Sequence, residues 1–236
     1  MIKNSLLDPA AKWIRETILI AKKDLAIERA TGEIVTTSGF FAILLTVLSS
    51  LAFRGGPDAA SLVAPGVIWL SVTFAAVLGL SRTWTREREE GALRGLVVAP
   101  LARSAIFAGK AIGVFAFVTA IEVLVIPASA VLLGFDLGRY ALGLAAIALF
   151  ANVGIAATGT LFGSMTVRTR ARDLVLASVL LPLLAPTLGS AIAATRELFE
   201  GGASVADLGD YLELMLVFDV VFCSAGLGLF GWLIEG

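Results

Sequence analysis

Six long apolar segments recur along the chain, and they constrain its fold more than any other feature. Each is roughly 20 residues or longer, the length that a helix needs to cross the hydrocarbon core of a bilayer. Apolar and polar residues do not alternate within them, so helices rather than the strands of a membrane barrel are predicted. Pro127 is expected to kink or end the third segment. The segments cover residues 35–53, 62–81, 104–133, 140–162, 174–194 and 211–234.

The composition fits a lipid environment. The 236-residue chain is 58% hydrophobic and 16% charged, whereas soluble domains are about half apolar and about a quarter charged. A water-soluble fold of this length could not bury so many apolar side chains, because its surface must be covered by polar groups. We therefore expect an all-α integral membrane domain over residues 35–236, with six transmembrane helices.

Residues 1–34 precede the first apolar segment and are charged throughout, so no cleaved signal peptide is expected. Within them, residues 8–31 have the pattern of an amphipathic basic helix, with Asp8 as its N-cap and Pro9 at its first position. Trp13 lies on the apolar side. Such a helix typically lies along a membrane surface. The alternative is a helix that packs on another part of the protein.

The connections between the apolar segments predict the orientation of the chain. Lysine and arginine concentrate before the first segment, between the second and third, and between the fourth and fifth. The other three connections carry one each, namely Arg54, Arg139 and Arg196. By the positive-inside rule, both termini are expected in the cytoplasm and the protein in the cytoplasmic membrane. Lys110 lies inside the third segment near its cytoplasmic end, where its side chain can reach the interface.

Several chemistries are excluded by residues that the chain lacks. There is no histidine, so a Ser-His-Asp triad, a histidine-ligated metal and a histidine axial ligand to haem are ruled out. Cys223 is the single cysteine, so no disulfide can form within the chain. The nucleotide-binding pattern G-x-x-x-x-G-K-[ST] is also missing, because Gly109-Lys110 lacks the upstream glycine and the following hydroxyl residue. We expect a non-catalytic subunit, without a nucleic-acid partner, that takes any energy from a separate chain.

The connection at about residues 82–104 is long and organised. Charged residues fill its first half, Gly91 permits a break, apolar residues follow at helical spacing, and Pro100 ends the element. This pattern predicts a short cytoplasmic helix on which a soluble partner could dock, and a push on it would move both attached spans. A plain solvated loop is the alternative. The residues expected to carry the contact are Glu89, Glu90, Gly91, Leu93, Leu96 and Pro100.

Three motifs resemble a known family. The sequence EEGALRGLVVAP at residues 89–100 resembles the E-x-G-x-L-x-x-L-x-x-[SA]-P element of ABC-2-type exporter permeases. KDLAIER at residues 23–29 and LVAPGVIW at residues 62–69 resemble the "KDL…E.R" and "LAPGVLW" motifs of the CcmB family, the haem exporter protein B of cytochrome c maturation. Length and number of spans agree over essentially the whole chain. One departure is Val-Val-Ala-Pro in place of the commoner Leu-Ser-Pro, which removes a hydroxyl group.

The resemblance implies an ABC-2-type permease architecture and a defined set of partners. CcmB proteins pair with the ATPase CcmA and, with CcmC and CcmD, form a complex that uses ATP to release the haem-loaded chaperone CcmE. Haem is then a candidate substrate, and no covalently bound cofactor is expected. A six-span ABC permease normally supplies one half of a pair, so a homodimer is expected. Two alternatives are an ABC-2 permease for a lipid, drug or polysaccharide, and a membrane scaffold without transport.

Two carboxylic acids interrupt the apolar segments, Glu122 in the third and Asp219 in the sixth. A carboxylate at the bilayer centre costs about 2.5–3.5 kcal/mol on insertion scales, so it normally faces protein or a water-filled cavity. Each is either a polar lining of a substrate path or coupling site, or a buried group that is protonated or hydrogen-bonded. Asn152 is expected to make a polar contact between helices. Glycines at close spacing, such as Gly154 and Gly159, indicate tight helix packing or a dimer contact.

Overall fold

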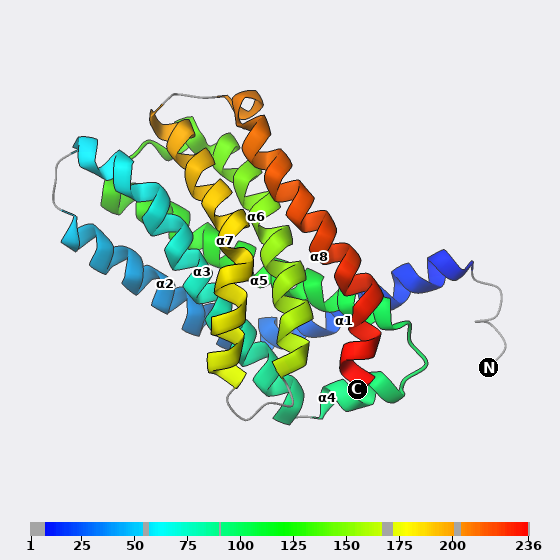
Figure 1. Cartoon of the computed structure of the whole chain (residues 1–236). Coiled ribbons are helices and arrows are strands. Elements are labelled where there is room, and N and C mark those ends of the chain that lie inside the picture. The colour runs from blue at the N-terminus through cyan, green and yellow to red at the C-terminus, as the bar shows by residue number, and fades with distance from the viewer. Residues whose placement is uncertain (1–7, 54–56, 90, 167–171, 201–203, 236) are drawn as a thin grey trace.

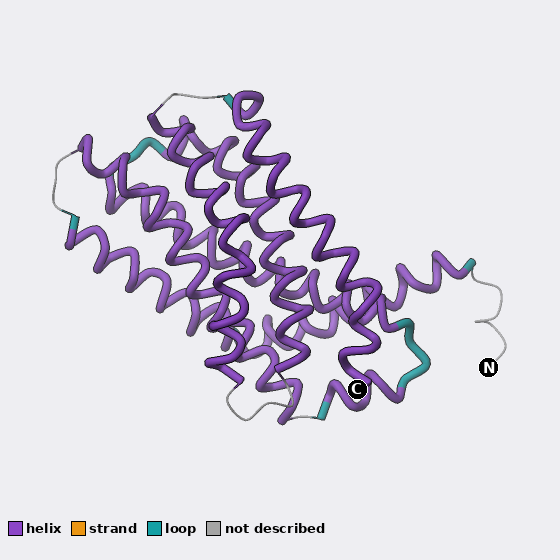
Figure 2. Tube along the Cα trace, in the orientation of Figure 1, coloured by secondary structure: helices purple, strands orange, loops and turns teal. Residues whose placement is uncertain are grey.

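The computed structural model describes residues 8–53, 57–89, 91–166, 172–200 and 204–235. All the regular structure in these ranges is helical (Figures 1 and 2). The elements are α1 (Pro9–Thr31), α2 (Glu33–Ala52), α3 (Pro57–Glu89), α4 (Ala92–Val98), α5 (Arg103–Leu133), α6 (Leu137–Thr166), α7 (Arg172–Glu200), the 3-10 turn η1 (Val205–Leu208) and α8 (Gly209–Glu235).

Six of these helices are long and apolar enough to cross a membrane, namely α2, α3, α5, α6, α7 and α8. The predicted all-α membrane fold with six spans after an N-terminal helix is therefore confirmed. Large apolar side chains remain exposed on the outer faces, as in lipid-facing helices; examples are Phe40, Val131 and Trp232, which are 72%, 84% and 82% exposed.

The spanning helices form a bundle in which α6 and α3 hold central places. α6 packs against α5, α7 and α8, while α3 packs against α2, α5 and α7. Buried apolar residues form three clusters along the bundle. The third cluster gathers at the end of the molecule where α1, α4 and the C-terminal part of α8 meet (Figure 1), and it contains Ile20, Trp84, Ile106, Phe107, Ala157, Leu161, Phe230 and Ile234.

Two helices extend beyond the boundaries that hydropathy predicts. α3 continues to Glu89, past the predicted end of the span at residue 81, because its last turns are charged but still helical. α5 continues through Pro127 to Leu133, so the prediction that this proline could end the helix is wrong.

α1 packs on α5. This is the alternative given above, in which the N-terminal helix packs on another part of the protein. Its buried residues are Glu16, Thr17, Ile20 and Ala21. Ile14, Ile18 and Leu19 remain exposed on another side. The helix therefore presents one face to the protein and keeps an apolar face for the membrane surface on which it is predicted to lie.

Candidate functional site

A short helix separates the second and third spans, as predicted. Gly91 adopts the left-handed conformation, with φ of 62°, and allows the chain to turn from α3 into α4. α4 ends at Ala99, whose backbone is extended. Of the predicted contact residues, Glu90 lies outside the described part of the chain, as does the side chain of Leu93.

One side of α4 packs against the bundle, and another side is exposed. Leu96 packs against the third apolar cluster, and Arg103 Nη1 at the start of α5 donates to the carbonyl oxygen of Leu96 over 3.5 Å. Val98 is 85% exposed, and Gly95 and Pro100 are exposed beside it. The arrangement leaves a small apolar surface that is held by contacts to the helices on either side.

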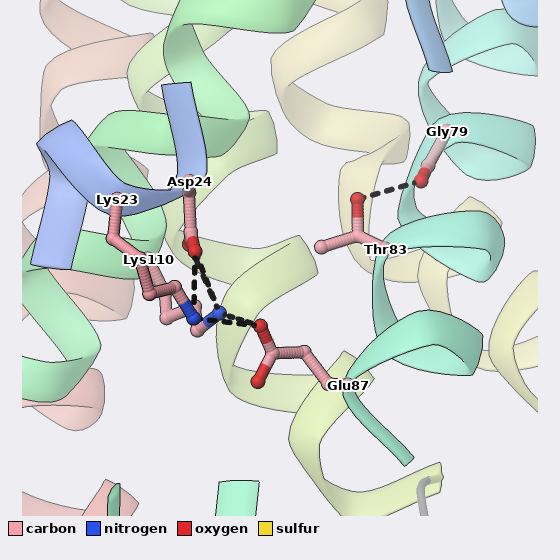
Figure 3. A network of polar contacts seen from close by, with 6 residues as sticks. All are labelled: Lys23, Asp24, Gly79, Thr83, Glu87 and Lys110. Carbon is pink, nitrogen blue, oxygen red and sulfur yellow. Dashed lines mark hydrogen bonds and ion pairs between the residues drawn. The ribbon is translucent and has the colours of Figure 1, made fainter. Parts of the chain in front are cut away.

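A cluster of charges joins α1, α3 and α5 (Figure 3). Lys110 Nζ lies 2.9 Å from Asp24 Oδ2 and also contacts Glu87 Oε1. Lys23 Nζ reaches the same two carboxylates, over 3.1 Å to Asp24 and 3.4 Å to Glu87. The expectation that Lys110 extends to the interface is wrong, because its side chain is only 1% exposed and is held inside the protein by these carboxylates.

The charges within this cluster balance. Two lysines face two carboxylates, so no charge is buried without a partner of opposite sign. Burial opposes the charged form of Lys23, but the charges and hydrogen bonds of Asp24 and Glu87 outweigh this effect and raise the pKa of Lys23 above its usual value.

Further contacts fix α1 to the beginning of α5. Trp13 Nε1 donates to Ser104 Oγ over 2.9 Å, and the backbone N–H of Ala102 donates to Glu16 Oε2 over 3.0 Å. Ala102 is the N-cap of α5 and makes no side-chain cap of its own, so α1 supplies an acceptor at this helix end. α1, α3, α4 and α5 are thus joined at one end of the bundle.

The intramembrane carboxylates lie on two sides of α6. Asn152 on α6 donates to Glu122 on α5 over 2.5 Å and to Thr119 over 3.2 Å. Asp219 on α8 is buried beside Gly154, where an added Cβ would lie 2.7 Å from Asp219 Oδ1. Neither oxygen of Asp219 has a hydrogen-bond partner among the residues described here. Asn152 therefore makes the predicted contact between helices, and the two acids belong to separate pairs of helices.

Sequence reasoning missed the charge cluster. Lys110 within an apolar segment was a signal that an opposite charge must lie near it. Its partners could not be identified, because Asp24 and Glu87 are 86 and 23 residues away in sequence.

Together these features define an all-α integral membrane protein with six spans and a short anchored helix between the second and third of them. Comparison with known proteins narrows the class. The model of the CcmB protein family matches residues 15–230. The chain therefore belongs to the CcmB family.

Curated relatives agree with this assignment. The chain is 31% identical to heme exporter protein B of Rhodobacter capsulatus over 172 residues, which are 72% of this chain and 77% of the relative. It is 30% identical to heme exporter protein B of Paracoccus denitrificans over 181 residues, 76% of this chain and 79% of that protein. The protein of the same name from Pseudomonas aeruginosa is 25% identical over 174 residues, 73% of this chain and 76% of the relative.

Proposed function

We propose that this protein is the permease subunit of an ABC transporter complex for cytochrome c maturation, in which it takes part in haem export or in release of a haem-loaded chaperone. Membership of the CcmB family and curated relatives that carry the name heme exporter protein B support this function. Haem enters the proposal as a substrate and not as a resident cofactor.

The observation that carries the coupling part of the proposal is the position of α4. This helix connects two spans, is anchored by Leu96 and Arg103, and presents Val98 to a partner. The chain lacks a phosphate-binding loop, so a CcmA-like ATPase would supply the energy. A displacement of α4 would reach α3 and α5 directly, and Glu87 and Lys110 would carry it to α1.

The orientation and the remaining partners follow from the same proposal. The end of the bundle that bears α1, α4 and the C-terminal end of α8 would face the cytoplasm, with the protein in the cytoplasmic membrane. CcmC- and CcmD-like membrane proteins and a CcmE-like chaperone would complete the assembly. Two copies of this chain would form the permease, because two ATPase subunits require two docking helices. Residues 1–34 would act as the cytoplasmic N-terminal part and residues 35–236 as the membrane domain.

Val98→Asp tests the proposal, because it places a charge on the exposed face of α4 without filling space inside the bundle. In a strain that lacks the native gene, we expect this variant to lose co-purification with the ATPase subunit and to lose haem-stained c-type cytochromes. Ala206→Asp is the matched control at the opposite end of the bundle, because it adds the same charge at an exposed position of η1 (Figure 1). This control should retain both co-purification with the ATPase subunit and haem-stained c-type cytochromes. The docking proposal fails if Val98→Asp keeps the ATPase bound, whatever happens to the cytochromes.

A further inference from the structure

A cavity of about 370 Å³ lies beside the charge cluster, between α1, the first turn of α2, α3 and α5. Part of its wall is charged, with Glu28 and Arg29 from α1, Arg86 and Glu87 from α3, and Lys110 from α5. The rest is apolar and includes Ile34, Val114, Phe117 and Ala120. A space with one ionic part and one apolar part is suited to an amphiphilic molecule.

The ionic part of the wall has unused bonding capacity of both signs. Lys110 already contacts Asp24 and Glu87, but the other oxygen of Glu87, Oε2, is buried without a hydrogen-bond partner among the described residues. Glu28 Oε1 accepts from the backbone N–H of Val35 over 2.9 Å, whereas its Oε2 is likewise buried and unpartnered. Arg86 Nη1 is buried with no acceptor in the part of the chain that the structure describes. Buried charged groups are costly unless they are hydrogen-bonded, so these three atoms indicate a ligand.

We propose that the cavity binds a phospholipid with a primary amine in its headgroup, of the phosphatidylethanolamine class. Its ammonium group supplies N–H donors for Glu28 and Glu87, and its phosphate accepts from Arg86, with Arg29 nearby. One acyl chain covers Phe117 and Ala120. This ligand satisfies atoms of both signs at once and keeps the local charge balanced.

Other ligands of related chemistry fit less well. An anionic phosphatidylglycerol brings no cation for the two carboxylates. A phosphatidylcholine has the same net charge, but its quaternary ammonium group has no N–H to donate. Soluble glycerophosphoethanolamine carries the right headgroup but leaves the apolar part of the wall uncovered. The site therefore discriminates by headgroup and also requires a chain.

Native mass spectrometry of the full-length protein tests the proposal directly. Purified protein is incubated in detergent with equal amounts of dioleoyl phosphatidylethanolamine, phosphatidylcholine and phosphatidylglycerol. We expect the ethanolamine lipid to be retained about tenfold more than either competitor, because it alone makes charge-assisted hydrogen bonds to groups of both signs. Equal retention of the three lipids, or preference for phosphatidylglycerol, overturns the proposal. So does displacement of the lipid by an equimolar amount of glycerophosphoethanolamine.

Variants then locate the bound lipid. Arg86→Gln and Glu28→Gln should each reduce retention about tenfold, and Ala120→Phe should do the same by filling the apolar part without altering the charges. Arg82→Gln is the control on the same helix, because Arg82 is exposed and pairs with Glu33 outside the cavity wall. Undiminished retention in Ala120→Phe, or an equal loss in Arg82→Gln, places the lipid elsewhere and overturns the assignment.

Discussion

Lys23 and Lys110 contact the same two carboxylates from different surroundings. The side chain of Lys23 is 38% exposed, whereas that of Lys110 is 1% exposed. If Lys23 is removed, water can solvate the carboxylates at the exposed side of the cluster. If Lys110 is removed, Asp24 and Glu87 lose a buried partner and their charges are left uncompensated.

This difference gives a paired prediction. Lys110→Met should lower the free energy of unfolding by about 3 kcal/mol, because Asp24 and Glu87 lose their buried partner. Lys23→Met should lower it by about 1 kcal/mol or less, because the exposed end of this side chain contributes little. Unfolding of both variants by denaturant in the same detergent, followed by tryptophan fluorescence, measures the two values. Similar losses in both variants would show that Lys110 is not the residue that holds the cluster together.

Gly226 on α8 permits a close approach to an aromatic side chain of α5. A Cβ at this position would lie 2.0 Å from the ring of Phe107, which also packs against Phe230 with ring centroids 5.6 Å apart. Gly226→Ala should therefore destabilise the protein by about 1–3 kcal/mol through overpacking. Gly228→Ala is the control on the same helix, since nothing lies within 4 Å of its added Cβ. Thermal unfolding in detergent compares them, and an equal Tm for the two variants contradicts the predicted contact.

At the scale of single residues, the sequence predicts which polar groups need a hydrogen-bond partner, but it does not identify the partner residue. Glu122 was identified from its place in an apolar run, and Asn152 was expected to bond between helices. That these two bond to each other depends on the rotation of α5 against α6, which hydropathy does not encode. Gly226 likewise meets Phe107, which lies on a distant segment and could not be identified from the spacing of glycines.

Among the elements, α1 gives the sharpest test of the packing. Gly109 on α5 lies so near to α1 that its added Cβ would be 2.7 Å from Ile20 Cβ. Disulfides form between Cβ atoms about 3.5–4.5 Å apart, so a small adjustment suffices. We predict that Ile20→Cys with Gly109→Cys, in a Cys223→Ser background, forms a disulfide on mild oxidation. Mass spectrometry of peptides from the oxidised protein detects the link between the two helices.

The control uses the exposed face of the same helix. Ile18 is 44% exposed, so Ile18→Cys with Gly109→Cys should not form the bond under the same conditions. Equal oxidation of both pairs would mean that α1 moves freely over α5, and that its position on the membrane surface, rather than its contacts with the protein, determines where it lies.

Helix boundaries show where sequence reasoning succeeds and fails at this scale. Gly91 was expected to break the chain before α4, and its left-handed conformation does so. The end of α3 was placed too early, because hydropathy records where a helix leaves lipid and not where its hydrogen bonding stops. The charged residues after residue 81 favour water, but they are good helix formers, so the helix continues to Glu89.

For the whole molecule, the proposed orientation predicts which sites an impermeant thiol reagent can reach. α4 and the start of α8 lie at opposite ends of the bundle (Figure 1), and both Val98 on α4 and Ser204, shortly before α8, are exposed. In a Cys223→Ser background, Val98→Cys should react only after the membrane is opened or inverted. Ser204→Cys should react in intact cells whose periplasm is accessible. Labelling of both residues from the same side would contradict the orientation derived from lysine and arginine.

The number of spans could be predicted for the molecule as a whole, because each long apolar run must satisfy its backbone inside lipid. The arrangement of the spans could not be predicted, because hydropathy does not indicate that α6 packs against α5, α7 and α8. Motifs such as LVAPGVIW indicate the family. They do not predict the cavity between α1, α3 and α5, because its wall is formed by residues from separate segments.

The docking of α1 on α5 imposes an order on biosynthesis. α1 leaves the ribosome first, but Glu16, Ile20 and Asp24 find their partners on residues that are made much later, from Ala102 to Lys110. Until the third span has been inserted, the N-terminal helix has no protein surface on which to bury that face. The nascent chain is then expected to keep α1 on the lipid surface through Ile14, Ile18 and Leu19, and to transfer it to α5 only after insertion.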